Sequence, residues 1–170
     1  LMSYLTNYQL IPLERAAEIL SDIIGQNVSE GTIVNVNNRL YKKLEEVETS
    51  IKQQLIGSSV VHFDETGMRS DGKTQWLHSA STEKLTHYEV HEKRGAKAAN
   101  DIGILPDFKG TACHDHWKPY YTFVDCSHSE CNSHNLRNLK GVYEDHKQNW
   151  AKDMAALLIE IKHRVDTLKS

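Results

Sequence analysis

The sequence predicts an α/β domain with a mixed sheet, preceded by a small all-α segment. In the first 57 residues, apolar positions recur every three or four residues, which is the period of amphipathic helices. From about residue 58 the composition shifts toward strand-forming residues, and short strand patterns then alternate with helical ones. We therefore expect a helical N-terminal segment at 1–57, an α/β core at 58–148 and a further helical stretch at 149–170.

The bulk properties narrow the class of protein. With 170 residues and 39% hydrophobic content, the chain can form one domain of ordinary size with a small appendage. A formal net charge of −3 gives no whole-chain basic signature, so any DNA binding must be local. Three cysteines, no secretory signal and no long apolar run favour a reduced, cytoplasmic setting. Because the chain ends within a predicted helix, we expect it to be a fragment of a longer protein.

Two helices are predicted in the N-terminal segment. The first begins at Pro12 and ends before Gly25, and Ser29 can cap a second that extends to about Leu55. Two helices joined by a glycine turn can form a DNA-binding helix-turn-helix, although the second carries few cations before Arg39. The other interpretation is a bundle that packs against a neighbouring element or subunit.

The order of elements after residue 58 predicts the topology of the core. Strands are expected at 60–67, 75–80, 86–91, 110–116 and 123–127, with helices at 94–102, 131–146 and from 150 onward, and a helical turn at 117–121. Three antiparallel strands followed by alternating helices and strands are the order of a ribonuclease H-like domain. The helix at 94–102 supplies the crossover that lets the first and fourth strands be parallel neighbours.

Two aspartates are the first candidates for chemistry. Asp64 comes after the buried strand pattern Val60 to Phe63, and Asp115 follows the small residues of the fourth strand. Because parallel neighbours end at the same edge of a sheet, we expect both carboxyl groups to face one cleft. Carboxylate oxygens bind Mg²⁺ or Mn²⁺, and a pair of such ions supports phosphodiester chemistry. Either aspartate alone would more often be a solvated acid.

A second group of candidate ligands is the series His128, Cys131 and His134, which recur every three residues. Zinc accepts such ligands, and His114, His116 or Cys126 is available as a fourth, but no CxxC or HxxxH pair fixes the geometry. The alternative is that Cys131 packs as a small apolar residue while His134 faces the acidic site as a hydrogen-bond donor.

The combination of motifs between residues 58 and 142 resembles a known family. The motifs are Phe63-Asp64-Glu65-Thr66-Gly67 with Asp71-Gly72-Lys73 and Trp76; Arg94-Gly95-Ala96; His114-Asp115-His116-Trp117-Lys118-Pro119-Tyr120; and His128-x-x-Cys131-x-x-His134-x-x-Arg137-x-Leu139. In this order and spacing they resemble the bacterial DDE transposases of the insertion-sequence-sixty-six class. Residues 8–55 also resemble the helical segment that precedes the catalytic core of that family.

The resemblance implies a DNA transposase with a ribonuclease H-like core and Mg²⁺ (or Mn²⁺) as cofactor. It implies that Asp64 and Asp115 are catalytic metal ligands, the first two acids of the triad, and we place His134 near them as a third site residue. Its partners would be transposon ends and target DNA, bound by a homo-oligomer. The competing hypotheses are a non-catalytic DNA-binding or assembly module and a zinc-stabilised structural domain.

The third acid of the family does not match any position in this chain. In the family the glutamate follows a helical insertion, and 149–170 resembles the start of that insertion. The acids Glu144, Asp145, Asp153 and Glu160 lack the motif, so we expect the third acid after Ser170. We therefore expect this chain to bind the metal weakly and to cut DNA poorly. Position 116 is histidine where the family often has glycine, which leaves Asp115 in place.

Overall fold

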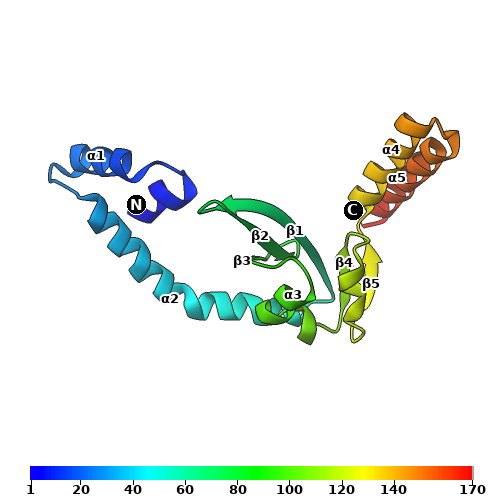
Figure 1. Ribbon diagram of the computed structural model, residues 1–170, viewed down its shortest axis with the longest axis horizontal. Coiled ribbons are helices and arrows are strands. Elements are labelled where there is room, and N and C mark those ends of the chain that lie inside the picture. The colour runs from blue at the N-terminus through cyan, green and yellow to red at the C-terminus, as the bar shows by residue number, and fades with distance from the viewer. Residues whose placement is uncertain (170) are drawn as a thin grey trace. The chain divides into compact units, whose positions relative to one another are not determined.

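The computed structural model describes residues 1–169, and the chain divides into two compact units. The first comprises residues 1–50 and the second begins at Ile51, so the division falls inside the long helix α2 (Glu30–Ile56). Figure 1 labels the elements of both units along the chain. The expected division of the second unit into 58–148 and 149–170 stays a prediction.

The first unit is helical, as predicted. It contains η1 (Tyr4–Tyr8), a short π-helical turn, followed by α1 (Leu13–Ile24) and most of α2. Gly25 ends α1 in the left-handed region at φ 71°, and the Ser29 hydroxyl caps α2 by accepting a hydrogen bond from the Thr32 N–H at 3.1 Å. These caps hold the two helices at a tight turn, across which they share a small apolar core of Ala16, Ala17, Leu20 and Ile33.

The second unit contains one five-stranded sheet. Its strands are β1 (Val60–Ser70), β2 (Lys73–Ser81), β3 (Thr86–His91), β4 (Thr111–His114) and β5 (Ser127–Glu130), in the spatial order β3-β2-β1-β4-β5. The first three pair antiparallel, whereas β1 with β4 and β4 with β5 pair parallel. The connection from β3 to β4 contains α3 (Ala96–Ile102), and a crossover of this kind allows β4 to pair parallel with β1. This mixed sheet is the ribonuclease H-like arrangement that the sequence predicts.

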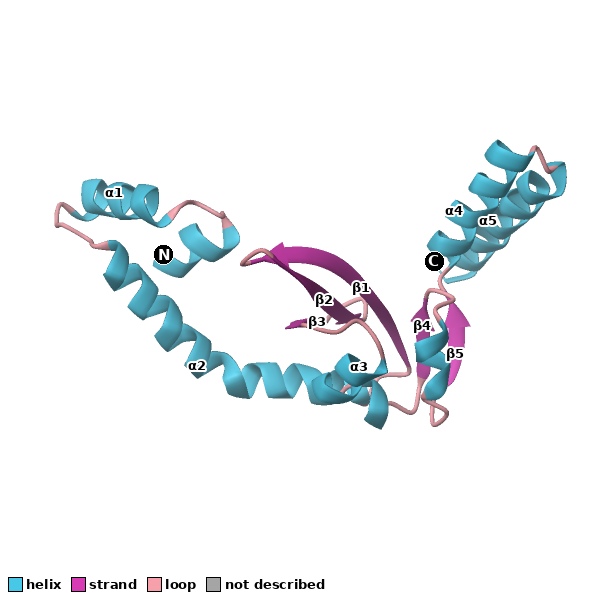
Figure 2. Ribbon diagram, in the orientation of Figure 1, coloured by secondary structure: helices cyan, strands magenta, loops and turns pink. Residues whose placement is uncertain are grey.

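The β1–β2 hairpin is longer than expected. Pairing with β2 continues to Ser70, and the turn at Asp71 and Gly72 has φ of 50° and 73°, as in a type I′ turn (Figure 2). The expectation that the first strand ends at residue 67 is therefore wrong. The reason is that the pairing with β4 stops at His62, while β2 keeps β1 extended to Ser70 as a two-stranded ribbon.

The position of β5 also differs from the prediction. A strand was expected at 123–127, but β5 runs from Ser127 to Glu130. The backbone before it turns instead, because the Phe123 N–H bonds the carbonyl of Tyr120 and the Phe123 carbonyl faces the His128 ring at 3.0 Å. Local hydrogen bonds thus take the groups that a strand at 123–127 would have used.

The core lies between the sheet and α3, and a glycine brings β4 against β1. Val61 and Phe63 of β1 are buried, and the Phe63 ring meets Phe108 edge to face at a centroid distance of 5.8 Å. A Cβ atom at Gly110 would lie 2.5 Å from the Ser59 carbonyl oxygen, so only glycine fits where the two strands begin. This close approach fixes the level at which β1 and β4 start to pair.

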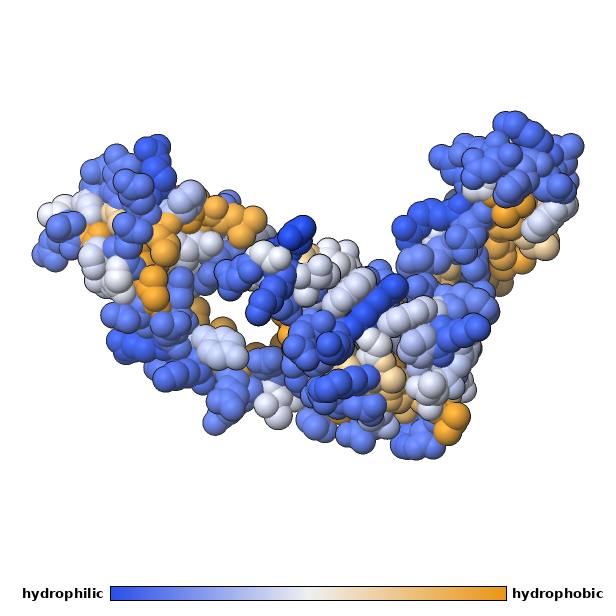
Figure 3. All heavy atoms as spheres, in the orientation of Figure 1, coloured by the Kyte–Doolittle hydropathy of each residue, from blue (hydrophilic) through white to orange (hydrophobic). Residues whose placement is uncertain are grey.

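The second unit ends in a helical hairpin of α4 (Asn132–His146) and α5 (Asn149–Lys169). One face of α5 carries exposed apolar side chains at helical spacing, namely Trp150, Met154, Leu157, Ile161 and Val165. Figure 3 shows hydrophobic surface on this hairpin. Across residues 1–169, none of the helices is long and apolar enough to cross a membrane. The other short helical turns of this unit are η2 (Leu105–Asp107) and η3 (Lys118–Thr122).

Candidate active site

Asp64 and Asp115 come from neighbouring parallel strands. The last pair in the register between β1 and β4 is His62 with Cys113, and each aspartate lies two residues beyond its member of this pair. Asp64 is exposed in the middle of β1, and its Oδ1 accepts a hydrogen bond from the Glu65 N–H at 2.9 Å. Asp115 follows β4 directly. The predicted pairing of the two strands is confirmed.

The carboxylate of Asp115 is oriented by the turn that follows it. Its Oδ1 accepts a hydrogen bond from the Trp117 N–H at 3.0 Å. Its Oδ2 lies 3.9 Å from Nη2 of Arg94, which is too long for a hydrogen bond but close enough for charge attraction. Each aspartate thus has one oxygen fixed by a backbone N–H and the other turned to its surroundings.

A buried carboxylate, Glu65, lies beside the two aspartates. Its side chain is only 2% exposed, and it accepts hydrogen bonds from Arg94 Nε at 2.8 Å and from the Tyr120 hydroxyl. Burial raises the pKa of Glu65, even though the bonds from Tyr120 and Arg94 act in the opposite direction. Glu65 is therefore a structural partner of Arg94 and Tyr120.

Arg94 is held between two tryptophan rings. Its guanidinium carbon lies 4.0 Å from the centroid of Trp117 and 5.0 Å from that of Trp76, within the range of cation–π attraction. Arg94, Trp117 and Tyr120 line a partly enclosed pocket together with Asp64. Of the two aspartates, Asp115 faces the Arg94 guanidinium, and Asp64 lines the same pocket.

Tyr120 connects these acids to a buried histidine. Burial and the nearby carboxylates of Glu65, Asp115 and Asp64 raise the pKa of the Tyr120 phenol, so the hydroxyl stays protonated and donates to Glu65. Its ring stacks on His114, at a centroid distance of 4.3 Å, and His114 is 1% exposed. Burial lowers the pKa of His114. The stacked rings of Tyr120 and His114 thus pack behind the acidic residues of the site.

The family to which the chain belongs follows from its sequence as a whole. The family model described as "Transposase IS66 family" matches residues 2–170. The chain belongs to the IS66 transposase family. No curated protein matches it.

Several solved structures share part of the fold with this IS66 chain. They include the HTLV-2 integrase catalytic core domain in complex with magnesium in its dimeric and trimeric forms, each 13% identical with a TM-score of 0.36. The match covers 56% of this chain and 81% and 80% of those chains. A simian T-cell lymphotropic virus intasome in complex with PP2A regulatory subunit B56 gamma is 12% identical, with a TM-score of 0.34, covering 56% of this chain and 46% of that one. These likenesses are distant, and the fold class rests on the strand order described above.

The predicted series His128, Cys131 and His134 is divided between two groups in the IS66 chain. His128 faces His114, with 2.9 Å between Nδ1 and Nε2, and its other nitrogen lies 3.9 Å from Cys126 Sγ. His134 instead lies next to Cys131, whose carbonyl accepts a hydrogen bond from the His134 N–H at 3.0 Å. Of the three, only Cys131 and His134 therefore contact each other, and a single zinc site built from this series is not assembled in the structure.

His134 lies in the first turn of α4, next to Cys131. Burial would raise the pKa of Cys131, but hydrogen bonds from His134 and from the N–H groups of His134 and Ser133 outweigh it and lower that pKa. Nδ1 of His134 is buried and, within residues 1–169, has no hydrogen-bond partner. The structure shows no hydrogen bond between His134 and Asp64 or Asp115 in this range, so its role at the site stays a prediction.

Sequence reasoning gave no role to Glu65, Arg94 and Tyr120. All three stand within the quoted motifs, where Glu65 counted only as the neighbour of Asp64. One signal was available, because strand alternation places Glu65 on the same face as the buried Val61 and Phe63. A carboxylate on a buried face needs a partner, and that requirement points to a nearby cation and hydroxyl.

Proposed function

We propose that this chain contributes Asp64 and Asp115 to the active site of an IS66 transposase that hydrolyses and joins DNA phosphodiesters, with Mg²⁺ or Mn²⁺ as cofactor. The observation that carries the proposal is the pairing of β1 with β4, which brings both aspartates to neighbouring strands at equal distance from the His62–Cys113 pair. Membership of the family supports the DNA substrate, namely transposon ends and target.

The residues present suit a divalent cation. Each aspartate has one carboxylate oxygen bonded to a backbone N–H, so its second oxygen is oriented and available. When bound, Mg²⁺ or Mn²⁺ would supply Lewis-acid stabilisation of charge on the phosphate and on the attacking and leaving oxygens.

The chain's own residues then have separate tasks. Asp64 and Asp115 hold the cation, the Trp117 N–H keeps the carboxylate of Asp115 oriented, and Tyr120 and Glu65 fix the surroundings. We also assign to His134 a hydrogen bond to a DNA phosphate, on the resemblance of its motif to that of the family; this bond would need a movement of the side chain, because its Nδ1 is buried. A nucleophilic water or 3′-hydroxyl would attack the phosphodiester in this setting.

Two carboxylates alone would hold the cation weakly. Two of the acids on α4 and α5 form ion pairs within their own helix. Glu144 Oε1 lies 3.8 Å from Lys140 Nζ, and Glu160 Oε1 lies 2.5 Å from Arg164 Nη2. We therefore do not assign the third acid to them. Weak metal binding and poor DNA cleavage by this chain are part of the proposal.

A second candidate function, an assembly module, is favoured by one observation. The part of α2 within the first unit exposes apolar side chains at helical spacing: Leu40, Leu44 and Val47 are 38%, 46% and 51% exposed. Such a stripe suits contact with a second subunit, as expected of a homo-oligomer on DNA. This role is compatible with a catalytic second unit.

Titration with Mn²⁺ tests the metal site. We expect isothermal calorimetry to show at least roughly tenfold weaker binding after Asp64→Asn or Asp115→Asn, because each change removes a charged oxygen ligand. The matched control is Asp125→Asn: Asp125 is 67% exposed, pairs with Lys109 and precedes β5, at the opposite end of the sheet. Unchanged Mn²⁺ binding in both site variants would contradict the proposal.

A further inference from the structure

The side chain of Arg94 is held by more contacts than a single ion pair with a carboxylate would provide. Fixing a free arginine side chain in one rotamer costs conformational entropy. Here two tryptophan rings, at 4.0 and 5.0 Å, and the Glu65 carboxylate, at 2.8 Å from Nε, hold it. Three separate segments of the second unit, carrying Glu65, Trp76 and Trp117, thus converge to fix one guanidinium.

The contacts of Arg94 leave its terminal nitrogens free. Only Nε hydrogen-bonds Glu65, and within residues 1–169 neither Nη1 nor Nη2 makes a hydrogen bond. Nη2 lies 3.9 Å from Asp115 Oδ2, beyond hydrogen-bond distance. The side chain is 36% exposed, so the free N–H groups are accessible beside the candidate metal ligand.

Free guanidinium N–H groups of this kind match a phosphate. The planar fork donates two parallel hydrogen bonds to phosphate oxygens, and stacking on aromatic rings keeps the fork in one plane. A chain with a net charge of −3 has no general attraction for DNA, so contacts to the backbone must come from single placed cations. Arg94 is such a cation, and it faces Asp115.

We propose that Arg94 binds a DNA backbone phosphate next to the cleavage site, and that Trp76, Trp117 and Glu65 are positioning residues that hold its guanidinium ready. This inference rests on the proposed function, because it takes DNA as the substrate at Asp64 and Asp115. It adds a residue that recognises the substrate to the residues that hold the metal.

The test is the salt dependence of DNA binding. Binding of a short DNA duplex is measured with Ca²⁺, which occupies carboxylate sites, at several salt concentrations for the chain and for Arg94→Gln. We expect affinity to fall roughly tenfold and the slope of log K against log salt to shrink by about 0.9, the value for one lost phosphate contact.

The matched control is Arg69→Gln, which removes the same charge from β1 at the hairpin end, where Arg69 bonds the Gly72 carbonyl. A slope change in Arg94→Gln no larger than in Arg69→Gln would overturn the proposal, because a general charge effect would then suffice. Far-ultraviolet circular dichroism checks that both variants fold.

Arg94→Lys keeps the test decisive if the glutamine variant does not fold. Lysine retains the charge but lacks the fork, so we expect the salt slope to be retained and the affinity to fall several-fold. Full affinity in Arg94→Lys would overturn the proposal. The Mn²⁺ titrations of the aspartate variants are read separately, so a failed metal site and a failed phosphate contact give different results.

Discussion

Asp64 and Glu65 are neighbours in the chain with the same charge, yet they lie in opposite environments. Strand alternation sends Asp64 to the exposed face of β1 and Glu65 to the buried face. The Glu65 carboxylate is consequently surrounded by Arg94 and Tyr120, while Asp64 keeps an oxygen available to solvent. The proposed metal ligand, Asp64, and the residue that holds Arg94, Glu65, are therefore adjacent in the sequence and differ in the face of β1 on which they lie.

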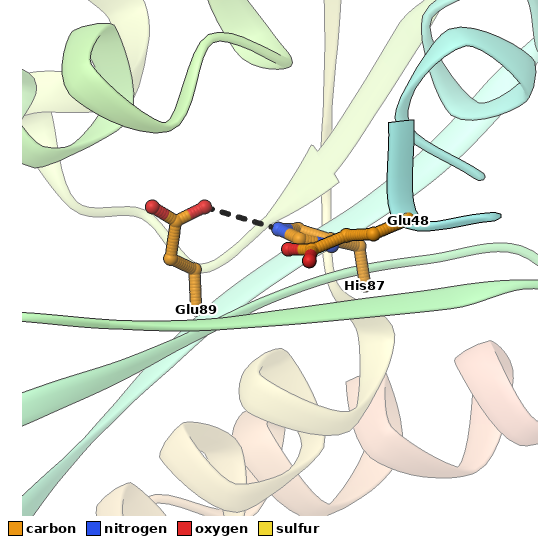
Figure 4. A group of neighbouring side chains, drawn as sticks. All are labelled: Glu48, His87 and Glu89. Atoms are coloured by element: carbon orange, nitrogen blue, oxygen red, sulfur yellow. Dashed lines mark hydrogen bonds and ion pairs between the residues drawn. The ribbon is translucent and has the colours of Figure 1, made fainter. Parts of the chain in front are cut away.

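A second paired acid, the partly buried Glu89, predicts a dependence of stability on pH. Its carboxylate lies 2.8 Å from Lys52 Nζ and 3.2 Å from the His87 ring, as Figure 4 shows for the histidine. Burial would raise the pKa of Glu89, but the hydrogen bonds from Lys52 and His87 outweigh it and the pKa is lowered. A lowered folded-state pKa stabilises the fold above the unfolded value of 4.5, and this contribution is lost as pH falls through the folded value.

The prediction is that Glu89→Gln lowers the free energy of unfolding at pH 7 by about 0.5 kcal/mol, a figure reduced for the partial exposure of the pair. The difference from the parent chain should shrink below pH 4.5, where the parent loses the same interaction. Urea unfolding at several pH values measures it, with Glu92→Gln as an exposed control on the loop after β3. A difference that does not change with pH would show that packing, not charge, connects Glu89 to Lys52.

The sequence predicts part of the candidate site for a clear physical reason. Asp64 and Asp115 stand in motifs at strand positions, and the helix at 94–102 makes their strands parallel neighbours. The roles of Arg94 and Tyr120 depend on how the segments that carry them pack against the sheet. In the structure the Trp76 and Trp117 rings fix the position of Arg94, and the spacing of residues along the sequence does not reveal such packing.

At the scale of elements, α2 belongs to both units and changes its environment along its length. Leu44, in the first unit, is 46% exposed, whereas Leu55, in the second, is fully buried beneath the sheet core. We expect Leu55→Ala to lower the free energy of unfolding by about 2–5 kcal/mol, because it leaves a cavity, and Leu44→Ala to change it by less than about 0.5 kcal/mol. Thermal and urea unfolding measure both.

The two leucines serve as controls for each other, since the same substitution is made in the same helix. A large loss of stability in Leu44→Ala would mean that the apolar stripe of α2 is covered in solution, which the assembly hypothesis predicts for an oligomer. Measuring that loss at two protein concentrations separates the cases, because oligomer stability depends on concentration.

The elements differ in how well the sequence predicts them. The limits of β3 agree with the prediction because both ends are marked by charged or turn residues, and Gly25 and Ser29 mark the helix ends in the first unit. The prediction for β5 is wrong because Phe123 favours a strand by its type, while hydrogen bonds to Tyr120 and His128 fix a turn. Strand propensity is overridden there by hydrogen bonds to residues three and five positions away.

At the scale of the whole molecule, charge sets a limit on DNA binding. Twenty lysines and arginines are outnumbered by 23 acids, and several cations are paired, including Lys52, Lys97 and Lys109. Few therefore remain to release counterions from DNA. DNA binding by this chain should therefore be weak. Its affinity should fall with salt concentration only as far as single phosphate contacts, such as that of Arg94, contribute.

Catalysis by the chain as a whole gives the last prediction. A cation held by two carboxylates keeps more of its water and places the reacting oxygens less firmly. We expect Mn²⁺-dependent nicking of supercoiled DNA by this chain to be slow, and a version that also carries the family's glutamate to be much faster, with Asp115→Asn abolishing the activity of both. Fast nicking by the chain alone, abolished by Asp115→Asn, would instead mean that an acid already present completes the site. Glu144→Gln and Asp145→Asn would then be compared with Glu65→Gln: loss in either α4 variant would identify the third ligand, whereas loss in Glu65→Gln alone would place it beside Arg94 and overturn the structural role given to Glu65 here.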